Sequence, residues 1–285
     1  MPDVRCVERL SRGYLIQRRE QELESFDAYV ARLNEYVEEV GERRGIKRID
    51  CPTNVDELTA SLPVNVGERE KATIILKEDT AVELGNPSVA SCAFILWPSN
   101  PTLVRDGRIT LIGPDIPESL GRSLPFAQIL IVHGRELKDQ HHLVLEQPYA
   151  ISNQIEGYMV RLAPQRQRMW TRVSKKVVER GFSFETLGRA IMAIYKSELP
   201  VIETVEVLFI TSSKEDVEAL ESLAREIQRI KDSTLSSRFI ATDDGSYECT
   251  SEYLDCRDCP DQVVCDDIRD LVRLKRKARK PSHPS

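Results

Sequence analysis

The sequence lacks the features that mark exported, membrane-bound and nucleic-acid-binding proteins. Its first residues, MPDVRCVERLSRGY, contain no apolar core that could serve as a signal peptide. No stretch approaches the roughly 18 to 20 apolar residues that a membrane helix requires. Acidic residues (46) outnumber basic ones (40), giving a net charge of −6, whereas nucleic-acid binding needs an excess of Lys and Arg. These absences predict a soluble, cytoplasmic protein that binds neither a membrane nor nucleic acid.

Two common ligand-binding signatures are also missing. No glycine-rich phosphate loop of the form G-x-x-x-x-G-K-S/T or G-x-G-x-x-G occurs in the chain. His133, His141 and His142 show no His-x-x-x-His spacing, so we expect them to be exposed or hydrogen-bonded structural residues. The phrase Gly113-Pro114-Asp115 predicts a turn in which the aspartate acts as a cap rather than in catalysis.

The cysteines are unevenly distributed, and their clustering needs a cause. An odd count of seven, without an export signal, argues against a disulfide framework. Cys92 lies in an apolar run and is expected to be a small buried thiol. Four other cysteines fall within 17 residues, in the pattern Cys-x6-Cys-x2-Cys-x5-Cys. A Cys-x-x-Cys pair can direct two thiolates at one metal. The predicted metal ligands are Cys249, Cys256, Cys259 and Cys265.

The surroundings of these four cysteines favour a metal over free thiols, and iron over zinc. The segment is rich in aspartate and offers little core, so a bound metal would supply the missing folding free energy. Zinc sites more often present two Cys-x-x-Cys pairs, and this segment has one pair with uneven flanking spacings. An iron–sulfur cluster is therefore the favoured interpretation, and a zinc site is the alternative.

Hydrophobic spacing separates helical from strand-forming parts of the chain. From Leu23 to Val40, apolar residues recur every three or four positions, which predicts an amphipathic helix that packs on its own domain. Short runs rich in Ile, Val and Leu, divided by turn residues, predict strands. Strands come first and helices mostly later, which favours an α+β domain with a mixed sheet and flanking helices. The other expected helices are 53–62, 173–180, 184–197 and 214–232, and the expected strands are 72–76, 91–97, 108–112, 127–132 and 204–210.

A series of short motifs runs through the middle of the chain. The most specific are Ile-Gly-Pro-Asp-Ile at 112–116 and Trp-x-Arg-x-Ser at 170–174. In order and approximate spacing, over about residues 63–250, the series resembles the central part of acetyl-CoA synthase, the beta subunit of the CO dehydrogenase/acetyl-CoA synthase complex. The other matching stretches are Val-Glu-Leu-Gly at 82–85, Asp-Gly-Arg-Ile-Thr-Leu at 106–111, His-Gly-Arg at 133–135, Val-Leu-Glu at 144–146, Glu-Gly-Tyr at 156–158, Gln-Arg at 165–166 and Leu-Gly at 187–188.

The resemblance implies a middle domain that lies beside a nickel–iron–sulfur site and helps to bind coenzyme A. Four arginines and a tryptophan within residues 161–172 suit a ligand with a purine and several phosphates. Guanidinium groups bind phosphate bidentately and an indole can stack on a base. A solvated basic face with a half-buried tryptophan is the alternative. We expect Arg166, Trp170 and Arg172 to contact coenzyme A, because both arginines fall on matching positions.

The resemblance also implies a Cys-Gly-Cys element that holds the catalytic nickel, and the chain contains none. It implies a 4Fe–4S cluster on cysteines that follow an aromatic-rich segment, and Tyr247-Glu248-Cys249 lies where that segment begins. We therefore expect an accessory or truncated acetyl-CoA-synthase-like protein of anaerobic one-carbon metabolism, with catalytic residues unassigned. The alternatives are a CO-methylating acetyl-CoA synthase subunit whose nickel site another chain completes, and a zinc-stabilised interaction module. The expected partners are CO dehydrogenase, a corrinoid iron–sulfur protein and other synthase subunits.

Three segments are expected along the chain. Residues 1–62 form a helical segment, residues 63–240 an acetyl-CoA-synthase-like α+β domain, and residues 241–285 a Cys-rich segment. A loop over 231–246 leads into the third segment, and a basic helix over about 260–280 ends it. The six basic residues near its end are interpreted as a solvated tail, with docking to an acidic partner as the alternative.

Overall fold

A computed structural model describes the chain in two compact units, Met1–Arg229 and Ile230–Ser285. The described residues are 26–60, 62–67, 74–134, 154–163, 168–236, 239–241 and 247–249. Several residues singled out above lie outside this set: Leu23, Arg135, His141, His142, Arg166, Cys256, Cys259, Cys265 and residues 260–280, where a basic helix is expected. Among the described helices, none is long and apolar enough to cross a membrane.

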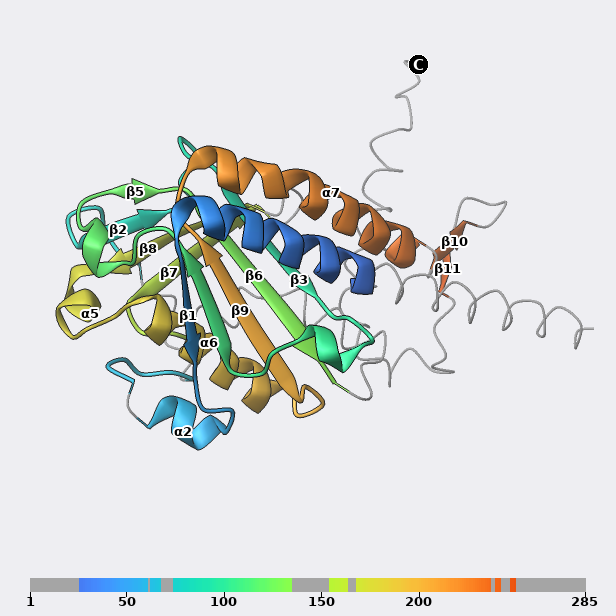
Figure 1. Ribbon diagram of the computed structural model, residues 1–285, viewed down its shortest axis with the longest axis horizontal. Helices are drawn as coiled ribbons and strands as arrows, with labels where there is room; N and C mark the ends of the chain where they lie inside the picture. Colours follow the sequence, from blue (N-terminus) through green and yellow to red (C-terminus); the bar gives the residue numbers. More distant parts are fainter. Residues whose placement is uncertain are drawn as a thin grey trace, which may run out of the picture. The chain divides into compact units, whose positions relative to one another are not determined.

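A five-stranded mixed sheet forms the centre of the first unit (Figure 1). The pairs β4–β9 and β3–β6 are parallel, whereas β1–β4 and β6–β9 are antiparallel. A mixed sheet with flanking helices confirms the predicted α+β class. Across the sheet the order is β1 (Ile46–Asp50), β4 (Arg108–Ile112), β9 (Thr204–Ile210), β6 (Phe126–His133) and β3 (Ser91–Leu96).

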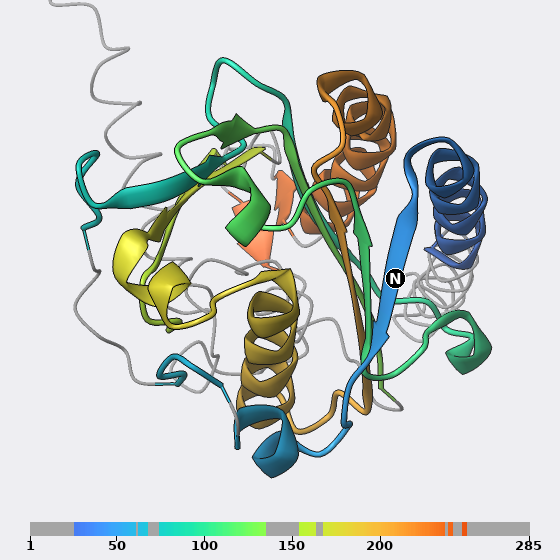
Figure 2. The same ribbon diagram turned by 60° about the vertical axis from the view of Figure 1, so that its left-hand side comes forward.

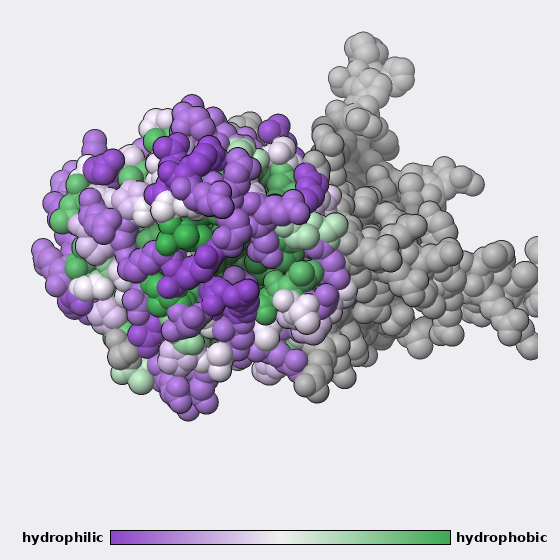
Figure 3. Space-filling view, in the orientation of Figure 1, coloured by the Kyte–Doolittle hydropathy of each residue, from purple (hydrophilic) through white to green (hydrophobic). Residues whose placement is uncertain are grey.

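Helices cover both faces of this sheet. The N-terminal helix (residues 26–44) and the first turns of α7 (Lys214–Ser236) lie on one face, and α6 (Phe184–Glu198) lies on the other (Figure 2). The predicted stripe of the N-terminal helix is buried from Phe26 to Val40 in the common core, as its spacing requires. Figure 3 shows that the outer surface on this side is largely hydrophilic, with several apolar patches between hydrophilic residues. The helix therefore packs on its own domain.

A second, four-stranded sheet lies on the same side of the central sheet as α6 (Figure 2). Its strands β2 and β8 are antiparallel neighbours, β7 pairs antiparallel with β8, and β5 pairs parallel with β2. The two sheets and α6 share one hydrophobic core. The strand order is β5 (Ser123–Leu124), β2 (Thr80–Leu84), β8 (Arg168–Ser174) and β7 (Tyr158–Ala163).

Short elements complete the first unit. Helix α2 (Val55–Thr59) is shorter than the predicted helix, and Asn54 caps it by accepting a hydrogen bond from the backbone N–H of Asp56. Helix α5 (Lys175–Glu179) follows β8 directly. The 3-10 turns are η1 (Pro101–Leu103) and η2 (Pro117–Ser119). The second unit contains a hairpin of β10 (Phe239–Ala241) and β11 (Tyr247–Cys249), with Phe239 opposite Cys249.

Several predicted boundaries were wrong. The described part of the expected strand 72–76, residues 74–76, is not a strand, because the chain turns there before β2. The expected helix 173–180 is preceded by β8, which runs to Ser174 and pairs with β7 in a hairpin that the sequence did not reveal. The expected loop 231–246 is helical as far as Ser236 and carries β10.

Candidate functional site

Two motifs far apart in the sequence meet across the four-stranded sheet. Glu83, from the Val-Glu-Leu-Gly stretch of β2, is the direct cross-strand partner of Arg172, from the Trp-x-Arg-x-Ser stretch of β8. Arg172 Nε donates to Glu83 Oε1 at 2.9 Å. Both side chains are largely buried, at 17% and 18% exposure. An ion pair so shielded from water is held more firmly than one on an open surface.

Arg172 has two further contacts inside the protein. Its Nη1 donates to the carbonyl oxygen of Ile75 at 3.1 Å. Its guanidinium lies over the indole of Trp170, with Cζ 5.0 Å from the ring centroid. Trp170 and Arg172 alternate with the buried Met169, Thr171 and Val173, so they share the partly exposed face of β8. Two of the three predicted coenzyme A residues are thus neighbours, and the third, Arg166, lies outside the described residues.

Glu83 is anchored by more than its arginine. Its Oε2 accepts hydrogen bonds from Asn86 Nδ2 at 3.1 Å and from Ser123 Oγ at 3.3 Å. Burial raises the pKa of Glu83, but the hydrogen bonds from Asn86 and Arg172 outweigh that effect and leave the pKa below its ordinary value. The carboxylate is therefore ionised at neutral pH and fixed by three side chains.

The Ile-Gly-Pro-Asp-Ile stretch at the end of β4 has a structural role. Gly113 has φ +109, and a Cβ atom there would lie 2.4 Å from the backbone nitrogen of Ser212, so only glycine fits. Asp115 Oδ1 accepts hydrogen bonds from the backbone N–H groups of Ile116 and Phe184, at 2.7 and 2.9 Å. Phe184 is the first residue of α6. The predicted turn with a capping aspartate is confirmed, and it also caps a helix distant in sequence.

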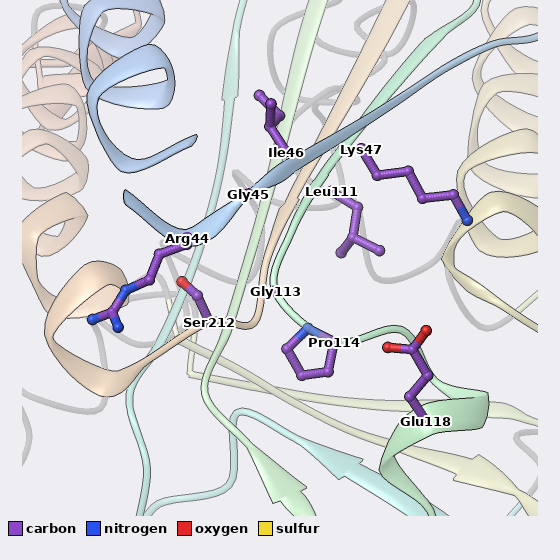
Figure 4. A pocket seen from close by; sticks show the side chains of 9 residues that line it. All are labelled: Arg44, Gly45, Ile46, Lys47, Leu111, Gly113, Pro114, Glu118 and Ser212. Atoms are coloured by element: carbon purple, nitrogen blue, oxygen red, sulfur yellow. The ribbon is translucent and has the colours of Figure 1, made fainter. Parts of the chain in front are cut away.

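An open pocket of about 480 Å³ lies beside this turn, where the parallel strands β4 and β9 end (Figure 4). Ligands of open α/β sheets often bind in such crevices. The connection after β9 enters α7 on one face of the sheet, whereas the chain after β4 passes to the other side (Figure 2). The lining residues are Arg44, Gly45, Ile46, Lys47, Leu111, Gly113, Pro114, Glu118 and Ser212.

The two cations of this pocket are paired with carboxylates of the protein. Arg44 points toward the first turn of α7 (Figure 4) and its Nε lies 3.1 Å from Oδ2 of the buried Asp216. Lys47 Nζ lies 3.7 Å from Asp115 Oδ2. Glu118 adds a negative charge and accepts a hydrogen bond from the backbone N–H of Asp115. Both cations of the pocket therefore already face carboxylates, and Glu118 leaves one negative charge in excess.

The N-terminus of α7 is likewise capped by side chains of the protein itself. Ser213 Oγ accepts a hydrogen bond from the backbone N–H of Asp216, and Ser212 Oγ donates to Asp216 Oδ2 at 2.7 Å. Burial raises the pKa of Asp216, but the hydrogen bonds from both serines and the charge of Arg44 outweigh burial and leave it below its ordinary value. The predicted helix start at Ser212-Ser213 is confirmed, and its N–H groups are capped internally.

Other motif residues also stabilise the fold. Asp106 binds Lys196 Nζ at 2.7 Å and accepts from the backbone N–H of Val205 at 2.9 Å, which joins β4, α6 and β9. Glu156 binds Arg180 at 2.7 Å. At Gly188, a Cβ atom would lie 2.5 Å from Ile109 Cδ1, so the glycine lets α6 approach β4 closely. Most described motif residues are therefore explained by packing, hydrogen bonding or turn geometry.

The remaining candidate ligands are placed as follows. His133 Nδ1 lies 3.0 Å from the carbonyl oxygen of Pro98, which confirms a hydrogen-bonded structural histidine. Cys92 is buried, as predicted. Cys249 is the last residue of β11, while the other three predicted metal ligands lie outside the described residues. Among the residues that the structure describes, no three His, Cys, Asp or Glu side chains gather as a metal site.

Sequence reasoning missed the role of Glu83. It belonged to a motif, but nothing local showed its partner, because 89 positions separate it from Arg172. One signal was present: Glu83 is a lone acid between the apolar residues Val82 and Leu84 of a strand-like run. An acid on the outward face of such a strand needs a cross-strand partner or solvent.

Comparison with known proteins shows which family this domain resembles. The family model of the CO dehydrogenase/acetyl-CoA synthase complex beta subunit matches residues 62–217, which include β2 to β9 and hence Glu83, Trp170 and Arg172. The Archaeoglobus fulgidus acetyl-CoA decarbonylase/synthase complex subunit beta is 31% identical over 72% of this chain and 40% of its own length. The Methanopyrus kandleri protein of the same name is 36% identical over 61% of this chain and 37% of its own length. The Methanosarcina thermophila subunit beta 1 is 31% identical over 67% and 40%. The chain thus spans about two fifths of the length of these relatives.

Proposed function

Since the chain belongs to the family of the CO dehydrogenase/acetyl-CoA synthase complex beta subunit, we propose that it is an accessory acetyl-CoA-synthase-like protein that binds coenzyme A and carries an iron–sulfur cluster. One observation supports the coenzyme A part above all. Within the matched domain, the half-buried Trp170 has Arg172 against its ring on a partly exposed sheet face. An indole beside a guanidinium suits a purine nucleotide.

The residues on this face suit the ligand in part. Trp170 offers a ring on which adenine can stack. Such stacking is favourable for any purine. Arg172 already directs Nε and Nη1 to Glu83 and Ile75. Arg166, which falls in the same motif series, would then supply the bidentate contact to a phosphate.

The cysteine segment carries the second half of the proposal. Four thiols within 17 residues are the donor set that a 4Fe–4S cluster requires, and Cys249 would hold it from the end of β11. The cluster would supply one-electron transfer. Since the 285 residues contain no Cys-Gly-Cys, acetyl group assembly at nickel would need ligands from another chain. The partners in anaerobic one-carbon metabolism would be CO dehydrogenase, a corrinoid iron–sulfur protein and other subunits of the complex.

Anaerobic purification followed by metal analysis tests the cluster. We expect a brown protein with about four irons per chain, and loss of iron when Cys256 and Cys259 are both replaced by Ser. Iron that survives this double replacement would rule out the ligand assignment. Nickel found with the iron would instead indicate an active synthase subunit, and a colourless protein with one zinc would indicate an interaction module.

Calorimetry with coenzyme A tests the ligand site. We expect binding by the natural sequence and a loss of at least about tenfold in affinity for the Arg166→Ala, Arg172→Ala double variant, which corresponds to about 1.4 kcal/mol. Dephospho-coenzyme A and adenosine serve as truncated ligands that separate the phosphate contribution from the stacking contribution. Equal affinity of both proteins would remove these arginines from the site.

A further inference from the structure

A chain of contacts leads from Glu83 through Arg172 to Trp170. Glu83 holds Arg172 Nε, and the guanidinium of Arg172 lies over the Trp170 ring. Building on the coenzyme A site proposed above, we infer that Glu83 is a positioning residue for that site. It fixes Arg172 against one face of the indole, so that Trp170 presents a defined surface to the adenine of the ligand.

The fixed geometry of Arg172 supports this role. Its guanidinium is planar, and two of its donors are directed to acceptors at 2.9 and 3.1 Å, one a side chain and one a backbone carbonyl. A planar group held at two points cannot rotate away from the ring without breaking both hydrogen bonds. A lysine at this position could satisfy the charge of Glu83 but could not form the same fork over the indole.

In the opposite role, the carboxylate of Glu83 would occupy the place of a ligand phosphate and would have to leave when the ligand binds. The anchors of Glu83 argue against it. Asn86 and Ser123 hold the second carboxylate oxygen, independently of Arg172. A displaced carboxylate would lose three hydrogen bonds in a site that is mostly shielded from water, which is costly. Glu83 therefore stays on Arg172 in the bound state, and phosphate contacts come from other groups.

Tryptophan fluorescence tests the positioning without any ligand. The sequence contains two tryptophans, and Trp97 is buried against Phe26, so a Trp97→Phe background isolates Trp170. In that background, Glu83→Gln should shift the emission of Trp170 and raise its quenching by acrylamide. Arg172→Met should change the emission and the quenching of Trp170 in the same direction. The Glu83→Gln, Arg172→Met double variant should show no further change.

Glu156 provides a matched control. Its carboxylate is 17% exposed, pairs with Arg180 at 2.7 Å and has a pKa lowered by hydrogen bonds from the Asn65 N–H and Arg180 that outweigh burial. Glu156→Gln therefore removes a comparable ion pair from the same domain. It should leave Trp170 emission unchanged. Identical changes in both variants would show that a general loosening of the fold, rather than the Arg172 contact, moves Trp170.

Coenzyme A titration of the same variants decides between the two roles. Glu83→Gln should weaken binding by about five- to tenfold, the size of one ordinary hydrogen bond, whereas Glu156→Gln should not. Tighter binding by Glu83→Gln would show that Glu83 competes with the ligand and would overturn the inference. If the natural sequence binds no coenzyme A, the coenzyme A part of the proposed function fails, while the emission comparison still decides whether Glu83 positions Trp170.

Discussion

The five-stranded and the four-stranded sheet differ in how their strands are buried. Strand β3 is buried at every position, and β6 at every position except His133, because helices or the second sheet cover both faces. In β8 the burial alternates, with Thr171 and Val173 inside and Trp170 and Arg172 partly exposed. The two sheets therefore have different roles. The five-stranded sheet forms the buried centre of the domain, and the four-stranded sheet presents the polar, aromatic face on which we place the proposed coenzyme A site.

The largest effect on stability is expected from truncating the core of the five-stranded sheet. Phe209 is fully buried, with its ring centroid 4.8 Å from that of Phe184. Phe209→Ala should lower the free energy of unfolding by about 3 to 5 kcal/mol through lost burial and a cavity. Trp170→Ala, on the four-stranded sheet, should lower it by about 1 to 2 kcal/mol but abolish coenzyme A binding. Urea denaturation measures the free energy of unfolding, and calorimetry measures the affinity for coenzyme A. Equal losses of stability in the two variants would contradict the different roles of the two sheets.

A smaller loss is expected at the turn that joins β4 to the pocket. Gly113→Ala combines a left-handed φ with a Cβ atom 2.4 Å from the backbone of Ser212. It should cost about 2 to 4 kcal/mol, since backbone must move as well.

Gly121, next to β5 of the four-stranded sheet, is the matched control for this substitution. It has φ +71, but no atom lies within 4 Å of the position that a Cβ atom would take there. Gly121→Ala should therefore cost about 1 kcal/mol, from conformational strain alone. Thermal denaturation of the pair separates the two contributions. Similar losses would mean that the Gly113 turn relaxes around a Cβ atom.

Acid should weaken both regions through different carboxylates. The pKa of Asp216 lies below its ordinary value of 3.8, although burial alone would raise it, because Ser212, Ser213 and Arg44 stabilise the charged form. A group with a lowered folded pKa contributes stability above its unfolded pKa and loses it as pH falls through the folded pKa. The free energy of unfolding should therefore fall below about pH 4. Asp216→Asn should remove part of this dependence.

Glu83 provides the corresponding group of the four-stranded sheet. Its pKa is also lowered from 4.5, by hydrogen bonds that outweigh burial. Emission of Trp170 in the Trp97→Phe background should change over the same acid range, and Glu83→Gln should remove that change while Asp216→Asn should not. An acid response of Trp170 that survives Glu83→Gln would mean that the two regions are not independent.

The sequence predicted the parts of this fold that local pattern decides. The stripe of the N-terminal helix, the strands rich in Ile and Val, and the start of α7 at Ser213 follow from spacing and capping, and the structure has all three. The hairpin of β7 and β8 was missed because its residues include arginines, which obscure the apolar alternation of β8. Ile74, Ile75 and Leu76 have the composition of a strand, yet the chain turns after them and only Ile75 is buried.

The candidate site shows the same limit. Sequence reasoning singled out Trp170 and Arg172, since a tryptophan beside arginines is a local signal. Their packing depends on Glu83 and Ile75, which strand pairing brings from a distance. Cross-strand partners cannot be read from one sequence without the register of the sheet. The proposed metal ligands Cys249, Cys256, Cys259 and Cys265 rest on their spacing.

The smallest effect is expected at the open pocket of the five-stranded sheet. Lys47 is 58% exposed and lies 3.7 Å from Asp115 Oδ2, so this exposed ion pair contributes little. Lys47→Ala should change the free energy of unfolding by no more than about 0.5 kcal/mol and leave coenzyme A affinity unchanged. Arg172→Ala, measured in parallel by calorimetry, should lose affinity. A loss of affinity in Lys47→Ala that matches or exceeds the loss in Arg172→Ala would place the ligand at the carboxyl ends of β4 and β9. The five-stranded sheet, rather than the four-stranded sheet, would then bind coenzyme A.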